Sequence, residues 1–180
     1  MEESPWKTTA SQNKYENRWI SVTEHSVVHQ TGGPGIYGVV HFKHLAIGIV
    51  PIDEQGFTWL VGQYRYPLSA YSWEIPEGGG ALDIPPIESA QRELKEETGI
   101  EAAHWQEILQ MHLSNSATDE RAIVYLATGL SMGASKPEDD ETLEVKKVKF
   151  EEALAMVLRG EITDAISVAA LLKVARMRGT

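Results

Sequence analysis

The stretch "RELKEETGI", residues 92–100, constrains the fold and the chemistry of this chain more than any other. It places Glu93, Glu96 and Glu97 at positions i, i+3 and i+4, which share one face of an α-helix. Gly99 suits the position just after a helix, where φ is positive. Like charges within one turn repel one another, and the helix dipole disfavours anions near its C-terminal end. Helix stability alone therefore does not explain these three carboxylates.

The residues around this stretch predict a helix from Pro86 to Thr98. Proline suits the first turn of a helix, where its missing N–H costs little. The apolar side chains of the helix fall on a face other than the acidic one, and an apolar face of this kind packs inward. That face consists of Ile87, Ala90 and Leu94.

Two interpretations of the acidic face follow. The more common arrangement is a solvated face, with Arg92 and Lys95 as compensating partners. The alternative is a site for a hard cation such as Mg²⁺ or Mn²⁺, which carboxylates from adjacent turns bind together with water and phosphate oxygens. Three consecutive glycines, residues 78–80, precede the helix and let the backbone approach a metal or a ligand. A glycine run is more often only a turn, so at this point both interpretations of the acidic face stay open.

"RELKEETGI" together with Gly78 resembles the signature of the Nudix hydrolases. That signature is a glycine, five residues, a glutamate, seven residues and then Arg-Glu-apolar-x-Glu-Glu-x-Gly-apolar. The one departure is Ile84, which stands where the signature has its first glutamate. In the family this glutamate pairs with the signature arginine, so the departure bears on how Arg92 orients Glu93. Asp83 and Glu88 are the alternatives for the missing carboxylate.

The resemblance extends over most of the chain, to the branch of ADP-ribose and nucleoside diphosphate sugar pyrophosphatases. The segments "LVGQYRYPLSAYSWEIPEGG" and "SNSATDERAIVYLATGL" carry it. It implies Mg²⁺-dependent hydrolysis of the diphosphate bond of a nucleoside diphosphate sugar, giving a nucleoside monophosphate and a sugar phosphate. ADP-ribose is the first candidate substrate and GDP-mannose the second. It also implies a homodimer whose N-terminal strands help to build the partner's substrate site.

The same resemblance assigns roles to residues. The implied metal ligands are the carboxylates of Glu93, Glu96 and Glu97 and the backbone carbonyl of Glu77, with Mg²⁺ as the cofactor and Mn²⁺ as its alternative. Catalytic roles fall to Arg92, Glu93, Glu97 and a base in the acidic loop, residues 138–141. Spacing to the following strand favours Glu141 as this base, ahead of Asp139 and Glu138. The expected substrate contacts are Arg65, Trp19, Tyr37, Glu74, Gly78 and Gly79.

Two of these substrate contacts rest on side-chain chemistry as well. The planar fork of Arg65 suits a pair of diphosphate oxygens, although an arginine at a strand end also pairs with surface acids. A nucleobase stacks on a flat apolar ring. Large aromatic side chains on strands more often belong to a core or a dimer interface, and that alternative stays open for each candidate. The candidates are Trp19 and Tyr37, ahead of Tyr71 and Trp73.

The expected fold class is α+β, a Nudix-type α/β/α sandwich with a mixed sheet and an N-terminal β-hairpin subdomain. We expect residues 1–43 to serve dimerisation and substrate contacts, and residues 44–180 to form the hydrolase domain. The first 18 residues are polar and are expected to lack regular structure. Hairpins are predicted within residues 18–42 and 44–66. Further strands are predicted within residues 105–113, 122–130 and 144–150, and helices within residues 151–160 and 163–179.

The composition of the chain limits the kinds of molecule that it can bind. A formal net charge of -10 argues against sequence-independent binding to nucleic acid, which needs a concentrated basic surface. The longest apolar run, residues 45–52, is too short to span a membrane, and the N-terminal residues have no signal core, so the expected compartment is the cytoplasm. Two alternative hypotheses for the function of the chain remain. One is a hydrolase of dinucleoside polyphosphates or capped RNA, and the other is a nucleotide-sugar-binding module in which Ile84 has impaired catalysis.

Overall fold

The computed structural model describes residues 3–133 and 143–179. By its internal contacts the chain forms two compact units. The first unit consists of residues 1–44 and 112–120, and the second of residues 45–111 and 121–180. The functions expected for residues 1–43 and 44–180 stay predictions.

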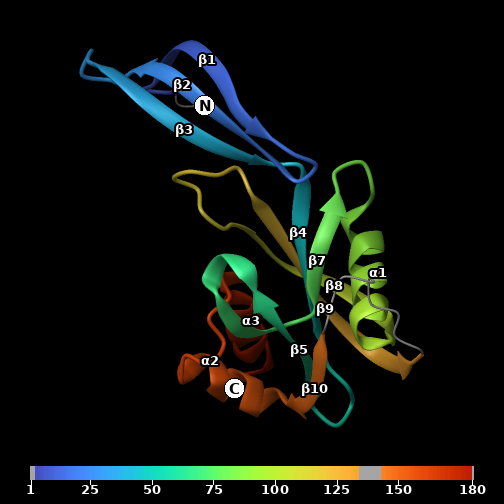
Figure 1. The fold of residues 1–180 in the computed structure, drawn as a ribbon. Helices are drawn as coiled ribbons and strands as arrows, with labels where there is room; N and C mark the ends of the chain where they lie inside the picture. Colours follow the sequence, from blue (N-terminus) through green and yellow to red (C-terminus); the bar gives the residue numbers. More distant parts are fainter. Residues whose placement is uncertain (1–2, 134–142, 180) are drawn as a thin grey trace. The chain divides into compact units, whose positions relative to one another are not determined.

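The first unit is a three-stranded antiparallel sheet in the order β1-β2-β3 (Figure 1). The predicted hairpin is confirmed as β2 (Ile20–Val28) and β3 (Pro34–Phe42). The expectation that the first 18 residues lack regular structure is wrong, because β1 (Lys7–Glu16) is a strand paired with β2. Every residue of β1 is exposed. Its pairing rests on backbone hydrogen bonds, which polar side chains permit, so the apolar pattern of the sequence did not reveal it.

Residues 112–120 bind the end of β3 within the same unit. The N–H of Val40 donates to the carbonyl of Ala117 at 2.9 Å. Asp119 accepts from the N–H of Phe42 at 2.9 Å and contacts His41 Nδ1 at 2.7 Å. Partial burial raises the pKa of Asp119, but these two hydrogen bonds outweigh that effect and hold the pKa below its usual value. Asp119 therefore fixes a strand end.

The second unit contains two sheets. One has the order β7-β4-β9-β8, and in it β4 runs parallel to β9 with Ile47 opposite Ile123. The other is antiparallel, with the order β10-β5-β6. The strands are β4 (His44–Pro51), β5 (Phe57–Arg65), β6 (Ala70–Glu74), β7 (Glu77–Ala81), β8 (Ile100–His112), β9 (Arg121–Met132) and β10 (Glu144–Lys149), and η1 (Tyr66–Leu68) is a short 3-10 turn.

The predicted hairpin of residues 44–66 is wrong in its pairing, although both of its strands exist. β4 and β5 belong to different sheets, and the turn between them is closed by an isolated bridge between Ile52 and Thr58 and by the hydrogen bond from the Asp53 N–H to the Phe57 carbonyl. β4 is buried along most of its length and lies between β7 and β9. Because an apolar run of this kind needs cover on both faces, β4 takes a central place, and β5 pairs with β10 and β6 instead.

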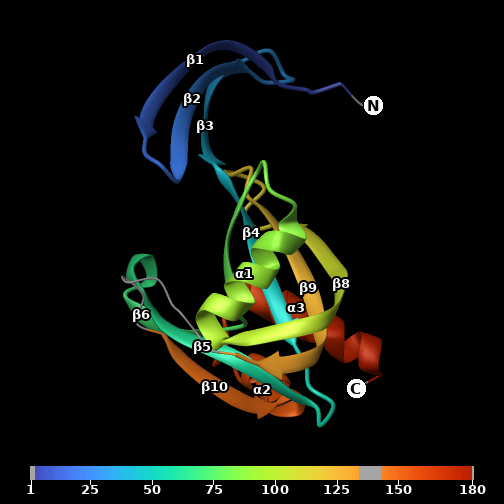
Figure 2. The same ribbon diagram turned by 90° about the vertical axis from the view of Figure 1, so that its right-hand side faces the viewer.

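Among the residues that the structure describes, three α-helices cover the sheets: α1 (Pro86–Thr98), α2 (Phe150–Leu158) and α3 (Ala165–Arg178). Figures 1 and 2 show α1 and α3 on opposite faces of the sheet that contains β4, which confirms the α/β/α sandwich. The predicted limits of α1 are confirmed, and Gly99 follows it with φ of 72°. Within residues 3–133 and 143–179, no helix combines the length and the apolar character needed to cross a membrane.

Apolar side chains beneath α1 hold this helix against the sheet. Leu94 and Ala90 are fully buried, in a cluster that includes Ile47 and Ile49 of β4. The inward face predicted from the sequence is therefore confirmed for these two residues. Because α1 presses onto the sheet along this line, its acidic face is brought beside the glycine-rich start of β7.

Candidate active site

Two of the three helix carboxylates are buried. Glu93 is 9% exposed and Glu97 is 3% exposed, whereas the side chain of Glu96 is 32% exposed. A solvated face does not describe Glu93 and Glu97. Burying ionised carboxylates is costly unless partners or cations compensate them, so this part of the helix requires such compensation.

Arg92 is one source of compensation. Its guanidinium donates to Glu93 Oε1 at 2.6 Å, to Glu96 Oε2 at 2.6 Å and to the carbonyl of Gly79 at 2.9 Å. Burial lowers the pKa of Arg92, but the charges and hydrogen bonds of Glu93 and Glu96 outweigh it and raise the pKa above its usual value. Arg92 thus stays charged and joins α1 to β7, the strand that contains Gly79.

Ile84 lies in the turn before α1 and is 43% exposed. In the part of the chain that the structure describes, neither Asp83 nor Glu88 forms an ion pair with Arg92. The guanidinium instead contacts the metal-site candidate Glu93 directly. Orientation of Glu93 by Arg92 is therefore achieved without a carboxylate from the turn.

Gly78 allows the backbone of β7 to approach Glu93. A Cβ atom at this position would overlap the carboxylate of Glu93, so any larger residue would displace that carboxylate. Glycine is therefore needed at position 78 for space.

Glu77, just before Gly78, connects both sides of the site. Its N–H donates to Glu97 Oε2 at 3.1 Å, and its Oε1 accepts from Arg65 Nη2 at 2.9 Å. Its Oε2 is buried and has no hydrogen-bond partner among the described residues. Burial raises the pKa of Glu77 well above its usual value, the charges of Asp164 and Glu74 raise it further, and Arg65 partly opposes them.

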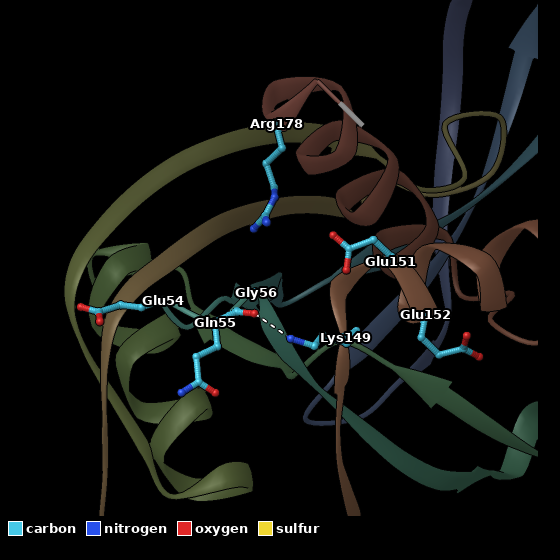
Figure 3. A pocket seen from close by; sticks show the side chains of 7 residues that line it. All are labelled: Glu54, Gln55, Gly56, Lys149, Glu151, Glu152 and Arg178. Carbon is cyan, nitrogen blue, oxygen red and sulfur yellow. Dashed lines mark hydrogen bonds between the residues drawn. The ribbon is translucent and has the colours of Figure 1, made fainter.

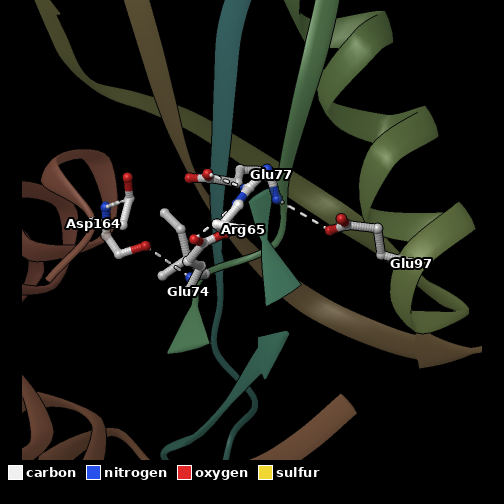
Figure 4. Close-up of polar contacts among 7 residues, drawn as sticks. Arg65, Glu74, Glu77, Glu97 and Asp164 are labelled. Atoms are coloured by element: carbon white, nitrogen blue, oxygen red, sulfur yellow. Dashed lines mark hydrogen bonds and ion pairs between the residues drawn. The ribbon is translucent and has the colours of Figure 1, made fainter. Parts of the chain in front are cut away.

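Arg65 is held by carboxylates on more than one side. Its Nε lies 3.0 Å and 3.1 Å from the two carboxylate oxygens of Glu74, and its Nη2 contacts both Glu74 and Glu77. Glu74 is 3% exposed. Partial burial lowers the pKa of Arg65, but Glu74, followed by Glu77 and Asp164, outweighs it and raises the pKa. Figure 4 shows Arg65 and Glu77 between Asp164 on one side and Glu97 on the other.

Sequence reasoning missed Asp164 and Ser167, which begin α3. Asp164 Oδ2 accepts from the N–H of Ser167 at 2.7 Å, and Ser167 Oγ accepts from the N–H of Ile75 at 2.9 Å. An aspartate before an apolar helical run is a recognisable N-cap signal, so the role of Asp164 in the helix was open to prediction. The contact of Ser167 was not, because Ile75 lies far away in the sequence.

The residues of this site fit a divalent cation by their chemistry. Carboxylates outnumber guanidiniums, and carboxylate oxygens are the ligands that Mg²⁺ and Mn²⁺ prefer. In the described parts of the chain, no three acidic or histidine side chains already form a ligand set, and Arg92 engages two of the candidates. The carboxylates are Glu74, Glu77, Glu93, Glu96 and Glu97, and the guanidiniums are Arg65 and Arg92.

The two favoured aromatic candidates belong to the first unit. Trp19 is 50% exposed, and the guanidinium carbon of Arg18 lies 4.0 Å from its ring centroid. The hydroxyl of Tyr37 donates to the carbonyl of Ser116 at 2.8 Å. Their contact with a nucleobase stays a prediction. The loop acids Glu138, Asp139 and Glu141 lie outside the described residues, so the role of Glu141 as the base stays a prediction.

A pocket of about 760 Å³ lies elsewhere in the second unit (Figure 3). It is formed by the turn between β4 and β5, the start of α2 and the end of α3. None of the site residues predicted from the sequence lines it. Its lining residues are Glu54, Gln55, Gly56, Lys149, Glu151, Glu152 and Arg178.

Comparison with known proteins agrees with this geometry. Residues 42–171 match the model of the NUDIX domain. The chain belongs to the Nudix family. Residues 6–40 of this Nudix protein also match the N-terminal domain of nucleoside diphosphate sugar hydrolases. The predicted family and branch are therefore confirmed, and the chain is a Nudix pyrophosphatase. Enzymes of this family generally use divalent metal ions.

Relatives of this Nudix pyrophosphatase span most of its length. An ADP-ribose pyrophosphatase of Mycobacterium tuberculosis is 34% identical, with 97% of this chain and 85% of the relative covered. One of Bacillus subtilis is 33% identical over 88% and 86%. A GDP-mannose pyrophosphatase of Yersinia enterocolitica is 30% identical, with 69% of each covered. A crystal structure of an ADP compounds hydrolase shares the fold, with a TM-score of 0.87, 18% identity and coverage of 98% and 96%.

Proposed function

We propose that this Nudix pyrophosphatase hydrolyses the diphosphate bond of a nucleoside diphosphate sugar in the presence of Mg²⁺. ADP-ribose is the first substrate to test, and the products are a nucleoside monophosphate and a sugar phosphate. The observation that carries this proposal is the burial of Glu93 and Glu97 beside the glycines of β7, together with Arg65 held by Glu74. The N-terminal domain match and the two ADP-ribose pyrophosphatase relatives support this class of substrate.

The proposed metal ligands are those that the sequence suggested. Glu93, Glu96 and Glu97 would supply carboxylate oxygens, and Glu77 would supply its backbone carbonyl. Mg²⁺ held by these residues would neutralise charge on the diphosphate and lower the pKa of a bound water molecule. Arg92 would then hold Glu93 and Glu96 in place from one side, as its hydrogen bonds do in the structure.

Arg65 is the proposed contact to the diphosphate. Its Nε and Nη2 are engaged by Glu74 and Glu77, and no described residue accepts a hydrogen bond from its Nη1. The two Nη1 hydrogens would therefore be available to phosphate oxygens. Glu74 is nearly fully buried, so we assign its contribution to holding Arg65 and not to touching the substrate. Gly78 and Gly79 would admit the substrate by leaving this part of β7 without side chains.

We further propose a homodimer, in which the first unit contributes to the interface. β1 exposes all its residues, and the same unit leaves large apolar side chains exposed. Exposed apolar groups of this kind mark interaction surfaces. They are Trp6, Tyr15, Trp19 and Ile36. Sedimentation analysis should give twice the mass of the chain.

The decisive experiment is a substrate panel. Purified protein is incubated with ADP-ribose, GDP-mannose and UDP-glucose, each with Mg²⁺, with Mn²⁺ and with a chelator, and the products are separated by ion-exchange chromatography. Metal-dependent release of AMP from ADP-ribose at the highest rate is the expected result. Release from none of the three substrates by folded protein would overturn the proposal.

GDP-mannose is the second candidate substrate. The GDP-mannose pyrophosphatase among the relatives favours it, and the same panel separates the two candidates. A kcat/KM for GDP-mannose above that for ADP-ribose would exchange their order and leave the chemistry of the site unchanged.

A further inference from the structure

The first turn of α3 contacts residues 75–77, which we call the active-site turn. This contact comes from the face of the sheet opposite to α1. Ser167 is fully buried, and its hydroxyl accepts the hydrogen bond of the Ile75 N–H at 2.9 Å. Ile75 is fully buried as well, so this N–H has no access to water. Two residues further along the chain comes Glu77, which carries the proposed ligand carbonyl.

Backbone contacts leave this turn little freedom. The carbonyl of Pro76 accepts from the N–H of Ile49 on the central strand β4 at 2.8 Å. The N–H of Glu77 is bound by Glu97 of α1. Ser167 supplies the third restraint through the N–H of Ile75, and it comes from α3, which lies outside the Nudix signature. Ile75 is thus held by α3, Pro76 by β4 and Glu77 by α1.

Apolar side chains also pack the start of α3 against Ile75. A Cβ atom at Gly48 of β4 would collide with Ile166 and come within 3.1 Å of Ile75. The absence of a side chain at Gly48 therefore lets the start of α3 and Ile75 meet over β4. The contact of Ser167 with Ile75 depends on this close approach.

Asp164 adds charge to the same turn. Its side chain caps α3 through the Ser167 N–H, so its position is fixed by the helix it begins. From there it lies close enough to Glu77 and Arg65 for its charge to act on both (Figure 4). It stabilises the guanidinium of Arg65 and makes the surroundings of Glu77 more negative.

We propose that the first turn of α3 is a positioning element of the active site, in which Ser167 holds the turn that carries the Glu77 carbonyl and Asp164 supplies negative charge that favours a divalent cation. Neither residue touches the reacting atoms. This inference rests on the proposed function, because it assigns to α3 the support of residues that the proposal places at the metal and the diphosphate.

The test measures Mn²⁺ binding by electron paramagnetic resonance, together with kcat and KM for ADP-ribose. Ser167→Ala removes the acceptor of the Ile75 N–H, and we expect Mn²⁺ affinity to fall about 10-fold. Asp164→Asn keeps a good helix cap and removes only the charge, and we expect at least a 3-fold loss, since attraction for the cation is weakened. Asp164→Ala, which also loses the cap on the Ser167 N–H, should bind Mn²⁺ more weakly than Asp164→Asn.

Val174→Ala is the matched control, because Val174 is fully buried on the same helix, two turns further along. It should lower thermal stability without changing Mn²⁺ affinity, kcat or KM. Wild-type affinity in both Ser167→Ala and Asp164→Asn would overturn the inference, whether or not the variants are less stable. In that case hydrolysis of ADP-ribose by the wild type would still support the proposed function. Absence of Mn²⁺ binding to the wild type would overturn both.

Discussion

The backbone N–H of Glu77 donates a hydrogen bond to Glu97 Oε2 at 3.1 Å. Through this bond the most deeply buried carboxylate of α1 also supports the turn from which the ligand carbonyl is proposed to come. A carboxylate has two oxygens, so one can hold the turn while the other faces a cation. The bond thus explains how a buried acid near a helix C-terminus is tolerated before any metal is bound.

The first prediction concerns Glu97→Gln. The amide oxygen of glutamine can still accept from the Glu77 N–H, so the fold should persist, and loss of a repelling charge should leave the melting temperature of the metal-free protein equal or higher. Metal-dependent turnover should fall by on the order of 10²-fold or more, because an anionic ligand is lost. Glu101→Gln, at an exposed acid paired with Lys95, is the control and should change neither quantity. Full activity of Glu97→Gln would exclude a metal at this helix face.

The second prediction concerns pH and Glu77. Burial, Asp164 and Glu74 raise its folded-state pKa above the usual value of 4.5. Between these two values the folded state holds a proton that the unfolded state has lost, so this contribution to stability is present at low pH and is lost as pH rises. Glu77→Gln removes the titration. In chelator, the melting temperature of the variant relative to wild type should therefore increase with pH above about 4.5.

Thermal unfolding followed by circular dichroism, at several pH values from 4.5 upward, measures this difference. The comparison uses the difference between the two proteins, because the variant also loses the contact with Arg65. Glu54→Gln, at an exposed acid far along the chain from this turn, controls for removal of a surface charge. A constant difference across the pH range would mean that Glu77 titrates normally in the folded protein.

The third prediction separates the structural and functional parts of Arg65. Arg65→Ala leaves Glu74 buried without its partner, and unfolding free energy should drop by about 2–4 kcal/mol. The value lies at the lower end for a buried pair because the Arg65 side chain is 35% exposed. Replacing both residues, as in Arg65→Ala with Glu74→Leu, should recover much of the stability. Urea titration measures both.

If Arg65 binds the diphosphate, the double variant should remain poor in kcat/KM even though it is stable again. We expect about a 10²-fold reduction relative to wild type, since an arginine fork aimed at developing phosphate charge is lost. Recovery of activity together with stability would instead assign Arg65 a purely structural role.

Local signals in the sequence predicted the helices and most strands well. Proline at its start and glycine after its end determine α1, and both act through their own backbone geometry. The position of β4 between two other strands was also predictable from its apolar run. The partner of β5 was not, because strand pairing depends on long-range contacts that no neighbouring residue encodes.

The site shows the same division between local and distant information. The spacing of Glu93, Glu96 and Glu97 follows from helix periodicity, so one element sufficed to group them. Their burial does not follow from spacing, because α1 must first pack on β7. The support of the turn by Ser167 lay beyond sequence reasoning as well, since it joins Ile75 to a helix formed by residues 165–178.

The fourth prediction concerns the base, which sequence spacing places at Glu141. Glu141→Gln should lower kcat by about 10²–10⁴-fold, the usual contribution of a positioned base, while KM and Mn²⁺ affinity stay close to wild type. Asp139→Asn and Glu138→Gln are matched controls from the same loop and should retain most of the activity. The pH dependence of kcat provides the second readout, because loss of the base should remove its acidic limb. Normal turnover by Glu141→Gln would assign the role of the base to Asp139 or Glu138 instead.

The fifth prediction concerns Ile84, where the Nudix signature has glutamate. Its side chain is 43% exposed, and the guanidinium of Arg92 already donates to Glu93, Glu96 and a backbone carbonyl. A carboxylate at position 84 would add a solvent-exposed partner to an arginine whose acceptors are in place, and exposed ion pairs contribute little. Ile84→Glu should therefore change kcat/KM for ADP-ribose by less than about 3-fold.

Arg92→Lys is the contrasting variant. Lysine keeps the charge but not the fork that bridges Glu93, Glu96 and the Gly79 carbonyl. Mn²⁺ affinity should fall about 10-fold, the effect expected when the group that orients a metal ligand is lost. Together the two variants test whether Arg92 depends on the signature glutamate or acts without it. A large gain in kcat/KM from Ile84→Glu would mean that Glu93 is poorly oriented in the natural protein, and that catalysis is restrained at this turn.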